Sequence, residues 1–142
     1  MGSTRLQLHG SRTSSSGSAE QAWLLYDADC GLCKFVVARV LELDRARRYR
    51  PLALQDPRAA ALLPGLDEQE RMASFHVVDA DGSVHSAGDG LAALLPPLRR
   101  APRAASGLYR LVAGNRDRLG KLIPDAARRQ AARRIAARTD GQ

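Results

Sequence analysis

Both cysteines of the chain lie in one short segment, Cys30-Gly31-Leu32-Cys33, with two residues between them. Two thiols at this spacing can cycle between a dithiol and a disulfide, or they can supply two ligands to a zinc ion. In disulfide exchange the attacking species is the thiolate. The elements beside the pair decide which sulfur ionises, because burial and nearby charge set the pKa of a thiol.

A buried strand and an amphipathic helix are predicted on the two sides of the pair. Residues 22–26 form a short apolar and aromatic run, and from Leu32 to Leu43 apolar residues recur at three- and four-residue spacing. Cys30 therefore falls at or just before the first turn of the helix, and Cys33 lies one turn further in. The free amides and the positive dipole end of a helix stabilise a thiolate there. We expect Cys30 to be the nucleophile and Cys33 the resolving thiol.

Two carboxylates flank the pair, and they allow two interpretations. Asp27 and Asp29 precede Cys30 closely, and negative charge opposes thiolate formation. One of them can instead accept or relay the proton of Cys33. We treat Asp27 as a supporting residue of the predicted redox site.

The segment resembles the signature of the DCC family, which is Asp-x-x-Cys-x-x-Cys, and Asp27, Cys30 and Cys33 fill its positions. The resemblance extends over roughly residues 22–120. It implies a thioredoxin-like fold and a thiol-disulfide oxidoreductase activity. Members of the family usually read Tyr-Asp-Gly at the start of the motif, whereas this chain has Ala28 in place of the glycine. The turn therefore either needs no positive φ at this position or tolerates some strain.

The order of predicted elements agrees with that resemblance. The order is strand, helix, strand, helix, strand, strand, helix, which is the thioredoxin-like order. After the first strand and helix, the predicted segments are a strand over 49–54, a short helix over 56–63, a hairpin of 72–79 and 84–86 that turns at Asp81-Gly82, and a helix over 88–95. We predict an α/β fold of three layers with a mixed central sheet, and Pro51 indicates that the second strand lies at the sheet edge.

The hairpin suggests one further site residue. Thioredoxin-like proteins carry a cis-proline at the start of this hairpin, facing the two sulfurs. Counting back from the Asp81-Gly82 turn, the matching position is Ser74. A serine would place a backbone amide and a hydroxyl near Cys30, where a proline offers neither. The other interpretation is that Ser74 only ends the preceding loop.

The chain divides by composition into three parts. Residues 1–21 are rich in Ser and Gly and are predicted to be a disordered tail, residues 22–98 the thioredoxin-like core, and residues 99–142 a basic helical extension with helices over 106–119 and 124–138. The extension carries twelve Arg or Lys against three acids. Its second helix has one large apolar residue, Ile135, so it needs a packing partner.

Two other functions are compatible with the sequence. A structural zinc site would use Cys30 and Cys33 with His76 and His85 of the hairpin. Alternatively, the Arg-rich C-terminal region would bind nucleic acid or an acidic partner, although it lacks the interleaved aromatic residues of base-stacking proteins.

The hypothesis of a redox dithiol also predicts the partners of the protein, and the sequence predicts its location. Thiol-disulfide exchange needs no cofactor, and its partner would be a protein or a low-molecular-weight thiol or disulfide. No run of residues is apolar enough for a membrane span, so we expect a soluble protein. We expect a cytoplasmic location, with organelle targeting by residues 1–21 as the alternative.

Overall fold

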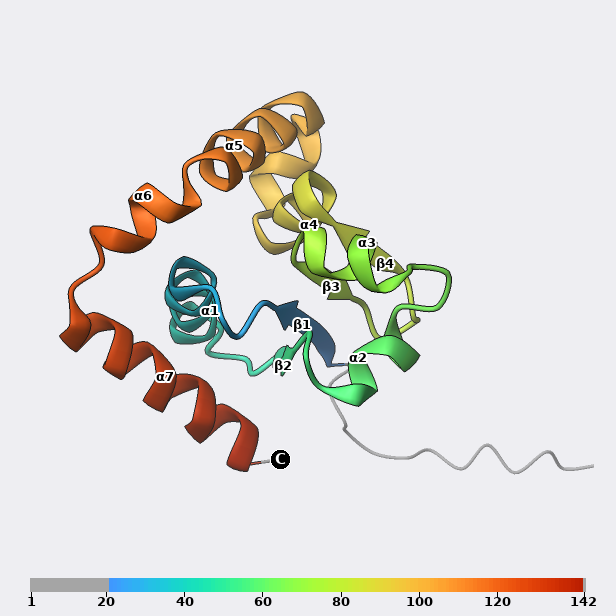
Figure 1. Ribbon diagram of the computed structural model, residues 1–142. Helices are drawn as coiled ribbons and strands as arrows, with labels where there is room; N and C mark the ends of the chain where they lie inside the picture. The colour runs from blue at the N-terminus through green and yellow to red at the C-terminus, as the bar shows by residue number, and fades with distance from the viewer. Residues whose placement is uncertain (1–20, 142) are drawn as a thin grey trace, which may run out of the picture.

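The computed structural model describes residues 21–141, and within them four strands form one mixed sheet in the order β2-β1-β3-β4 (Figure 1). Strand β1 (Ala22–Tyr26) lies between β2 (Tyr49–Ala53), which is parallel to it, and β3 (His76–Val78), which is antiparallel. Strand β4 (Val84–Ser86) pairs antiparallel with β3. The predicted α/β thioredoxin-like fold with a mixed sheet is confirmed, and β2 lies at an edge of the sheet as its proline indicated.

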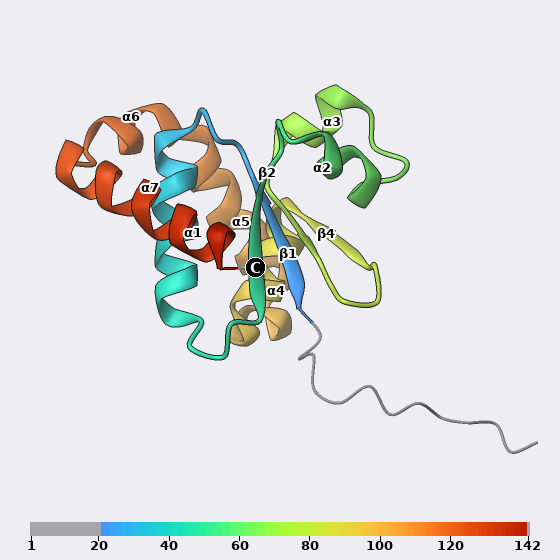
Figure 2. The same ribbon diagram turned by 90° about the horizontal axis from the view of Figure 1, so that it is seen from below.

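Helices cover both faces of this sheet, which gives three layers (Figure 2). The helices are α1 (Gly31–Leu43), α2 (Pro57–Leu62), α3 (Glu68–Ala73), α4 (Ala87–Leu94), the 3-10 helix η1 (Pro96–Arg100), α5 (Pro102–Gly114), α6 (Arg116–Lys121) and α7 (Asp125–Asp140). Helices α1, α4 and α7 lie on one face of the sheet, and α2 and α3 lie on the other.

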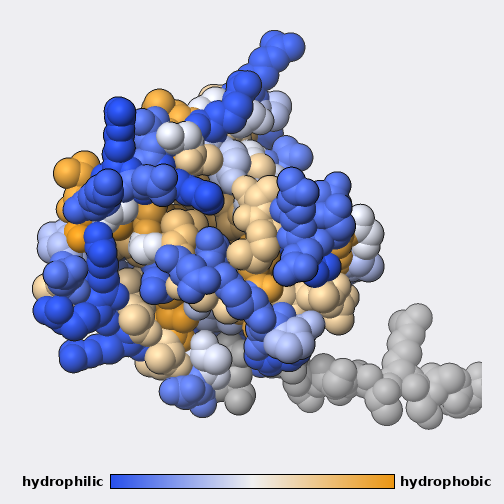
Figure 3. All heavy atoms as spheres, in the orientation of Figure 1, coloured by the Kyte–Doolittle hydropathy of each residue, from blue (hydrophilic) through white to orange (hydrophobic). Residues whose placement is uncertain are grey.

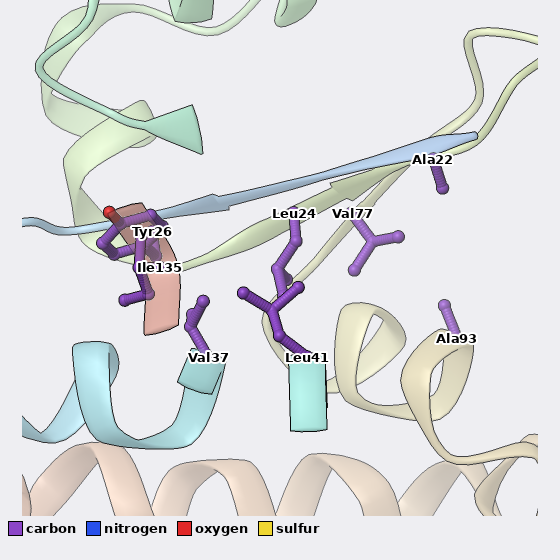
Figure 4. Close-up of a cluster of buried hydrophobic side chains, with 8 residues drawn as sticks. All are labelled: Ala22, Leu24, Tyr26, Val37, Leu41, Val77, Ala93 and Ile135. Carbon is purple, nitrogen blue, oxygen red and sulfur yellow. The ribbon is translucent and has the colours of Figure 1, made fainter. Parts of the chain in front are cut away.

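Strand β1 holds the layers together because its successive side chains point to opposite faces. Leu24 is 1% exposed and packs with Val37 and Leu41 of α1 (Figure 4). Leu25 is 0% exposed and packs on the other face with Leu63, which follows α2. Burial of a leucine side chain stabilises the fold by about 2 kcal/mol. The end of β1 is therefore firmly placed, and the cysteine segment follows directly from it.

The first strand of the hairpin is shorter than the sequence predicted. We expected a strand over 72–79, but α3 extends through Ala73 and β3 begins at His76. The reason lies at the N-terminus of α3, where Asp67 and Glu70 form a reciprocal capping box. Such a box satisfies two free amides and stabilises the helix over residues 68–73, which was not among the elements predicted from the sequence.

The hairpin turn is also displaced by one residue. The predicted centre was Asp81-Gly82, but the amide of Gly82 donates to the carbonyl of Asp79, so that Ala80 and Asp81 occupy the centre. Gly82 follows the turn with a φ of 87°. A glycine in this conformation after a two-residue turn is typical of three-residue hairpin loops.

The helix predicted over 106–119 is two helices, α5 and α6, with a break at Asn115. Its side-chain amide donates to the carbonyl of Leu111 at 2.8 Å. This bond satisfies a carbonyl at the end of α5, and the preceding Gly114 is a poor helix former. The break changes the direction of the chain after α5 and carries α6 toward the start of α1 (Figure 1).

Helix α7 has the packing partner that its sequence required. It lies along α1, where Ala131 and Ile135 are buried. Its exposed side carries arginines interspersed with alanines, and Figure 3 shows hydrophilic and moderately hydrophobic atoms mixed on this face of the molecule. Three of its arginines make contacts within the chain: Arg128 with carbonyls at the end of α6, Arg134 with Glu42, and Arg138 with Asp44.

A buried carboxylate joins α1, β2 and α7. The side chain of Asp44 is 2% exposed, and it accepts hydrogen bonds from the amides of Arg48 and Tyr49. The guanidinium of Arg138 donates to the same carboxylate at 3.2 Å and to the carbonyls of Leu41 and Asp44. Because every partner is satisfied, this buried ion pair is compatible with a stable fold.

No helix within residues 21–141 combines the length and apolar character needed to cross a membrane. The predicted disordered tail and targeting segment of residues 1–21 lie almost entirely outside the described residues.

We expect Arg138→Ala to lower the free energy of unfolding by about 3 kcal/mol, because it leaves the buried Asp44 carboxylate with only the exposed Arg48 guanidinium, at 4.0 Å, as a charged partner. Arg133→Ala, on the exposed side of the same helix, is the matched control and should change it by less than about 0.5 kcal/mol. Urea titrations of both variants measure the difference. Equal stability of the two variants would show that α7 does not depend on this contact.

Candidate active site

The cysteine segment begins with a turn that the carboxylate of Asp27 organises. Its Oδ1 atom accepts the amide of Asp29 at 2.9 Å and the side-chain amide of Gln55 at 2.8 Å. The Gln55 carbonyl in turn accepts the amide of Ala28 at 3.1 Å. Ala28 is not among the residues with positive φ, so the turn does not need the glycine of related motifs. These hydrogen bonds thus fix the orientation of the turn that connects β1 to α1.

Cys30 is the N-cap of α1, and its sulfur takes the place of the usual oxygen cap. The Sγ atom accepts the amide of Cys33 at 3.2 Å. Ser, Thr, Asp and Asn are the common caps, because their oxygens satisfy amides in the first turn. A sulfur in this position lies against the positive end of the helix, where a thiolate is favoured.

The two sulfurs are neighbours. The Cys33 Sγ atom lies 2.6 Å from the Cys30 Sγ atom and donates a hydrogen bond to it. Both residues are free cysteines of intermediate exposure. One turn of helix therefore brings the predicted pair close enough for a disulfide to form by side-chain movement alone.

The second sulfur is strongly biased toward the protonated state. Burial raises the pKa of Cys33 to about 12, with further contributions from the hydrogen bond to Cys30, the charge of Cys30 and the charge of Asp27. The guanidinium of Arg116, at the start of α6, opposes this rise in pKa. The two thiols thus have different surroundings, because Cys30 caps the helix and Cys33 is a partly buried hydrogen-bond donor.

An apolar groove of about 280 Å³ lies beside this pair. Its walls come from α1, the end of α3, α4 and α5, and Cys33, Asp27 and Ser74 are among its lining residues. Helix α5 forms the outer wall because Gly88 lets it approach α4 closely. A Cβ atom at Gly88 would lie 2.8 Å from the Cα atom of Ser106.

Ser74 therefore shares the groove with Cys33. It is the C-cap of α3 with extended backbone angles, φ −151° and ψ 170°, and no cis peptide bond occurs within residues 21–141. Its side chain lies close to Tyr109 of α5 and opposes the rise in the Tyr109 pKa that burial causes. The structure thus brings Ser74 to the site, where its contribution to chemistry stays a prediction.

The family model described as DCC1-like thiol-disulfide oxidoreductase matches residues 24–122. The chain belongs to this family. The match runs from β1 to the end of α6, so it includes the cysteine pair, the hairpin and the two helices beside the groove. It confirms the resemblance to the DCC family seen in the sequence. A comparison with curated proteins gives no match, and a comparison with solved structures gives none.

The geometry of this DCC1-like protein argues against the zinc hypothesis. His76 is 1% exposed, and both of its ring nitrogens have partners, the hydroxyl of Ser86 at 2.6 Å and the carbonyl of Arg71 at 2.9 Å. His85 contacts the carboxylate of Asp79 at 2.9 Å. Across residues 21–141, no three His, Cys, Asp or Glu side chains converge on a common point. The predicted set of two cysteines and two histidines is therefore not assembled.

Sequence reasoning missed two residues of this DCC1-like site, Gln55 and Arg116. Gln55 directly follows the predicted second strand, and the carboxyl ends of neighbouring parallel strands meet at one sheet edge, so its proximity to Asp27 could have been inferred. Arg116 lies in the stretch that resembles the family, but its approach to Cys33 could not be inferred, because it depends on the break between α5 and α6.

We expect Asp27→Asn to lower the pKa of Cys33, because a negative charge that opposes its thiolate is removed. In a Cys30→Ser background, alkylation of Cys33 by iodoacetamide at a fixed alkaline pH should then become severalfold faster. Asp29→Asn is the matched control, since Asp29 is exposed and is not among the groups that act on Cys33. An unchanged alkylation rate in Asp27→Asn would contradict the electrostatic role of Asp27.

His76 should make the fold sensitive to acid. Burial lowers its pKa below the ordinary 6.5, so the unfolded chain binds this proton more readily than the folded chain. Stability is therefore fully present above about pH 6.5 and falls as the pH drops through the lowered pKa. Urea titrations from about pH 7.5 to about pH 5 should show this loss, and His76→Gln should show a smaller pH dependence. Parallel curves for the two proteins would refute the assignment.

Proposed function

We propose that this DCC1-like protein catalyses thiol-disulfide exchange, with Cys30 as the nucleophile and Cys33 as the resolving thiol. The observation that carries the proposal is the contact between the two sulfurs at 2.6 Å, with the earlier one at the N-cap of α1. A helix N-terminus stabilises the thiolate that attacks, and a neighbouring thiol can then displace the bound partner.

In the first step the Cys30 thiolate attacks one sulfur of a substrate disulfide. The substrate S–S bond breaks, a mixed disulfide forms on Cys30, and the departing substrate thiolate takes a proton. In the second step Cys33 loses its proton and attacks the Cys30 sulfur, which releases the second substrate thiol. The substrate disulfide is thereby reduced to two thiols, and the protein dithiol is oxidised to a disulfide. A second dithiol, of a protein or a small molecule, returns the two electrons.

The environment of Cys33 suits this order of events. Before the first step, the charge and the hydrogen bond of Cys30 both raise the pKa of Cys33. Once Cys30 is part of a mixed disulfide it carries no charge, so this part of the pKa rise disappears. Cys33 then ionises more readily when its attack is required. Asp27, whose charge acts on Cys33, is the proposed acceptor of its proton.

Ser74 is proposed to orient the substrate rather than to react. It lies on the same groove as Cys33, and its extended backbone leaves an amide and a carbonyl at the end of α3. A partner chain bound beside the sulfurs could hydrogen-bond to such groups.

The test is a disulfide-reductase assay of purified protein with a dithiol as electron source. We expect Cys30→Ser to lose all turnover, and Cys33→Ser to accumulate a mixed disulfide that mass spectrometry detects. Both substitutions change one atom, and thermal unfolding should show that both variants remain folded. Turnover that persists in Cys30→Ser, or a wild-type pair that forms no disulfide in a redox titration, would overturn the proposal.

A further inference from the structure

The apolar groove beside Cys33 is elongated along α1. The α1 residues that line it run from Leu32 and Cys33 through Val36 to Val40. At the rise of an α-helix this segment is about 12 Å long. Cys33 lies near the N-terminal end of this segment, and Leu94, Leu95 and Leu108 of the neighbouring helices also line the groove.

The groove leaves large apolar side chains open to solvent. Val36, Leu95 and Leu108 line it and are 42%, 43% and 43% exposed. Exposed apolar residues that gather around one concave site, rather than scattering singly, indicate a binding surface.

The groove carries one cation near Cys33, the guanidinium of Arg116. Arg116 is exposed, and within residues 21–141 its guanidinium forms no ion pair. Asp27 is the one acidic residue of the lining, but its Oδ1 atom is occupied by Gln55 and by the amide of Asp29. Arg116 is therefore the group available to an incoming anion.

We propose that this groove binds a single-chain amphiphile, a medium-chain carboxylate whose alkyl tail lies along α1 and whose anionic head contacts Arg116. The volume fits such a ligand, because a cavity of about 150 Å³ accepts benzene and this groove is roughly twice as large, enough for about ten carbon atoms. The length of the groove and the position of its single cation agree with one tail and one head.

A polypeptide segment fits the groove less well. A peptide carries an amide and a carbonyl at every residue, and these groups need hydrogen-bond partners when they leave water. The part of the groove that runs from Val36 to Leu95 is lined by apolar side chains. An alkyl chain makes no such demand, so the lining favours it over a backbone.

Occupancy of the groove would also affect the dithiol. The head of the ligand would lie beside Cys33, and it would cover this thiol while its charge opposed ionisation. Under the proposed function, the bound amphiphile therefore slows the resolving step rather than the attack by Cys30.

The first test is calorimetric titration of the protein with decanoate. We expect saturable binding to the wild type, no measurable binding of acetate, and an affinity about tenfold lower in Arg116→Gln, because a charge-assisted contact is lost. Arg118→Gln, an exposed arginine of the same helix that does not line the groove, should bind like the wild type. Decanol should bind the wild type and Arg116→Gln equally, which isolates the contribution of the head group.

The second test separates this inference from the proposed function. The Cys30→Ser/Cys33→Ser double variant has no redox chemistry, and it should bind decanoate as the wild type does. In the reductase assay, decanoate should lower turnover of the wild type and protect Cys33 from alkylation in Cys30→Ser. Absence of decanoate binding, equal affinity in Arg116→Gln and Arg118→Gln, or binding of an apolar peptide in place of decanoate would overturn the inference while leaving the dithiol chemistry intact.

Discussion

The burial of two adjacent leucines on opposite faces of β1 is the constraint on which this structure depends. Leu24 packs toward α1 and Leu25 toward α2, so one strand is covered from both sides. β1 also pairs with strands on both edges, which leaves it no freedom to shift register. The chain therefore leaves the sheet at a defined point after Tyr26, and the reactive segment begins there.

The chemistry of the site follows from this placement, because two identical side chains enter different surroundings within one helical turn. Cys30 takes the position of a cap and faces free amides, whereas Cys33 enters the wall of an apolar groove. Their different surroundings are thus a consequence of backbone geometry. The charges of Asp27 and Arg116 act on Cys33 with opposite sign, because Asp27 raises its pKa and Arg116 lowers it.

The parts of the fold that were predictable from the sequence are those fixed by local pattern. The apolar run before Tyr26 and the periodicity from Leu32 to Leu43 placed the dithiol at the start of α1, and the order of elements gave the sheet. The predicted helix and strand boundaries were wrong where short-range hydrogen bonds, rather than the apolar periodicity, decide where an element begins or ends. The capping box at Asp67 and the side-chain hydrogen bond of Asn115 are the two cases. The groove could not be predicted, because it exists only once α5 packs against α4 and so faces α1 across the groove.

The ion pair between Asp44 and Arg138 joins residues that are 94 positions apart in the chain. Contacts of such high sequence separation carry a large loop-closure entropy, and they tend to form after local structure is in place. The docking of α7 would then be a late event in folding, which follows assembly of the sheet with α1. An interaction made after the rate-limiting step slows unfolding without speeding folding. The basic C-terminal helix α7 would accordingly slow the unfolding of the strand and helix that carry the dithiol, without changing how fast they fold.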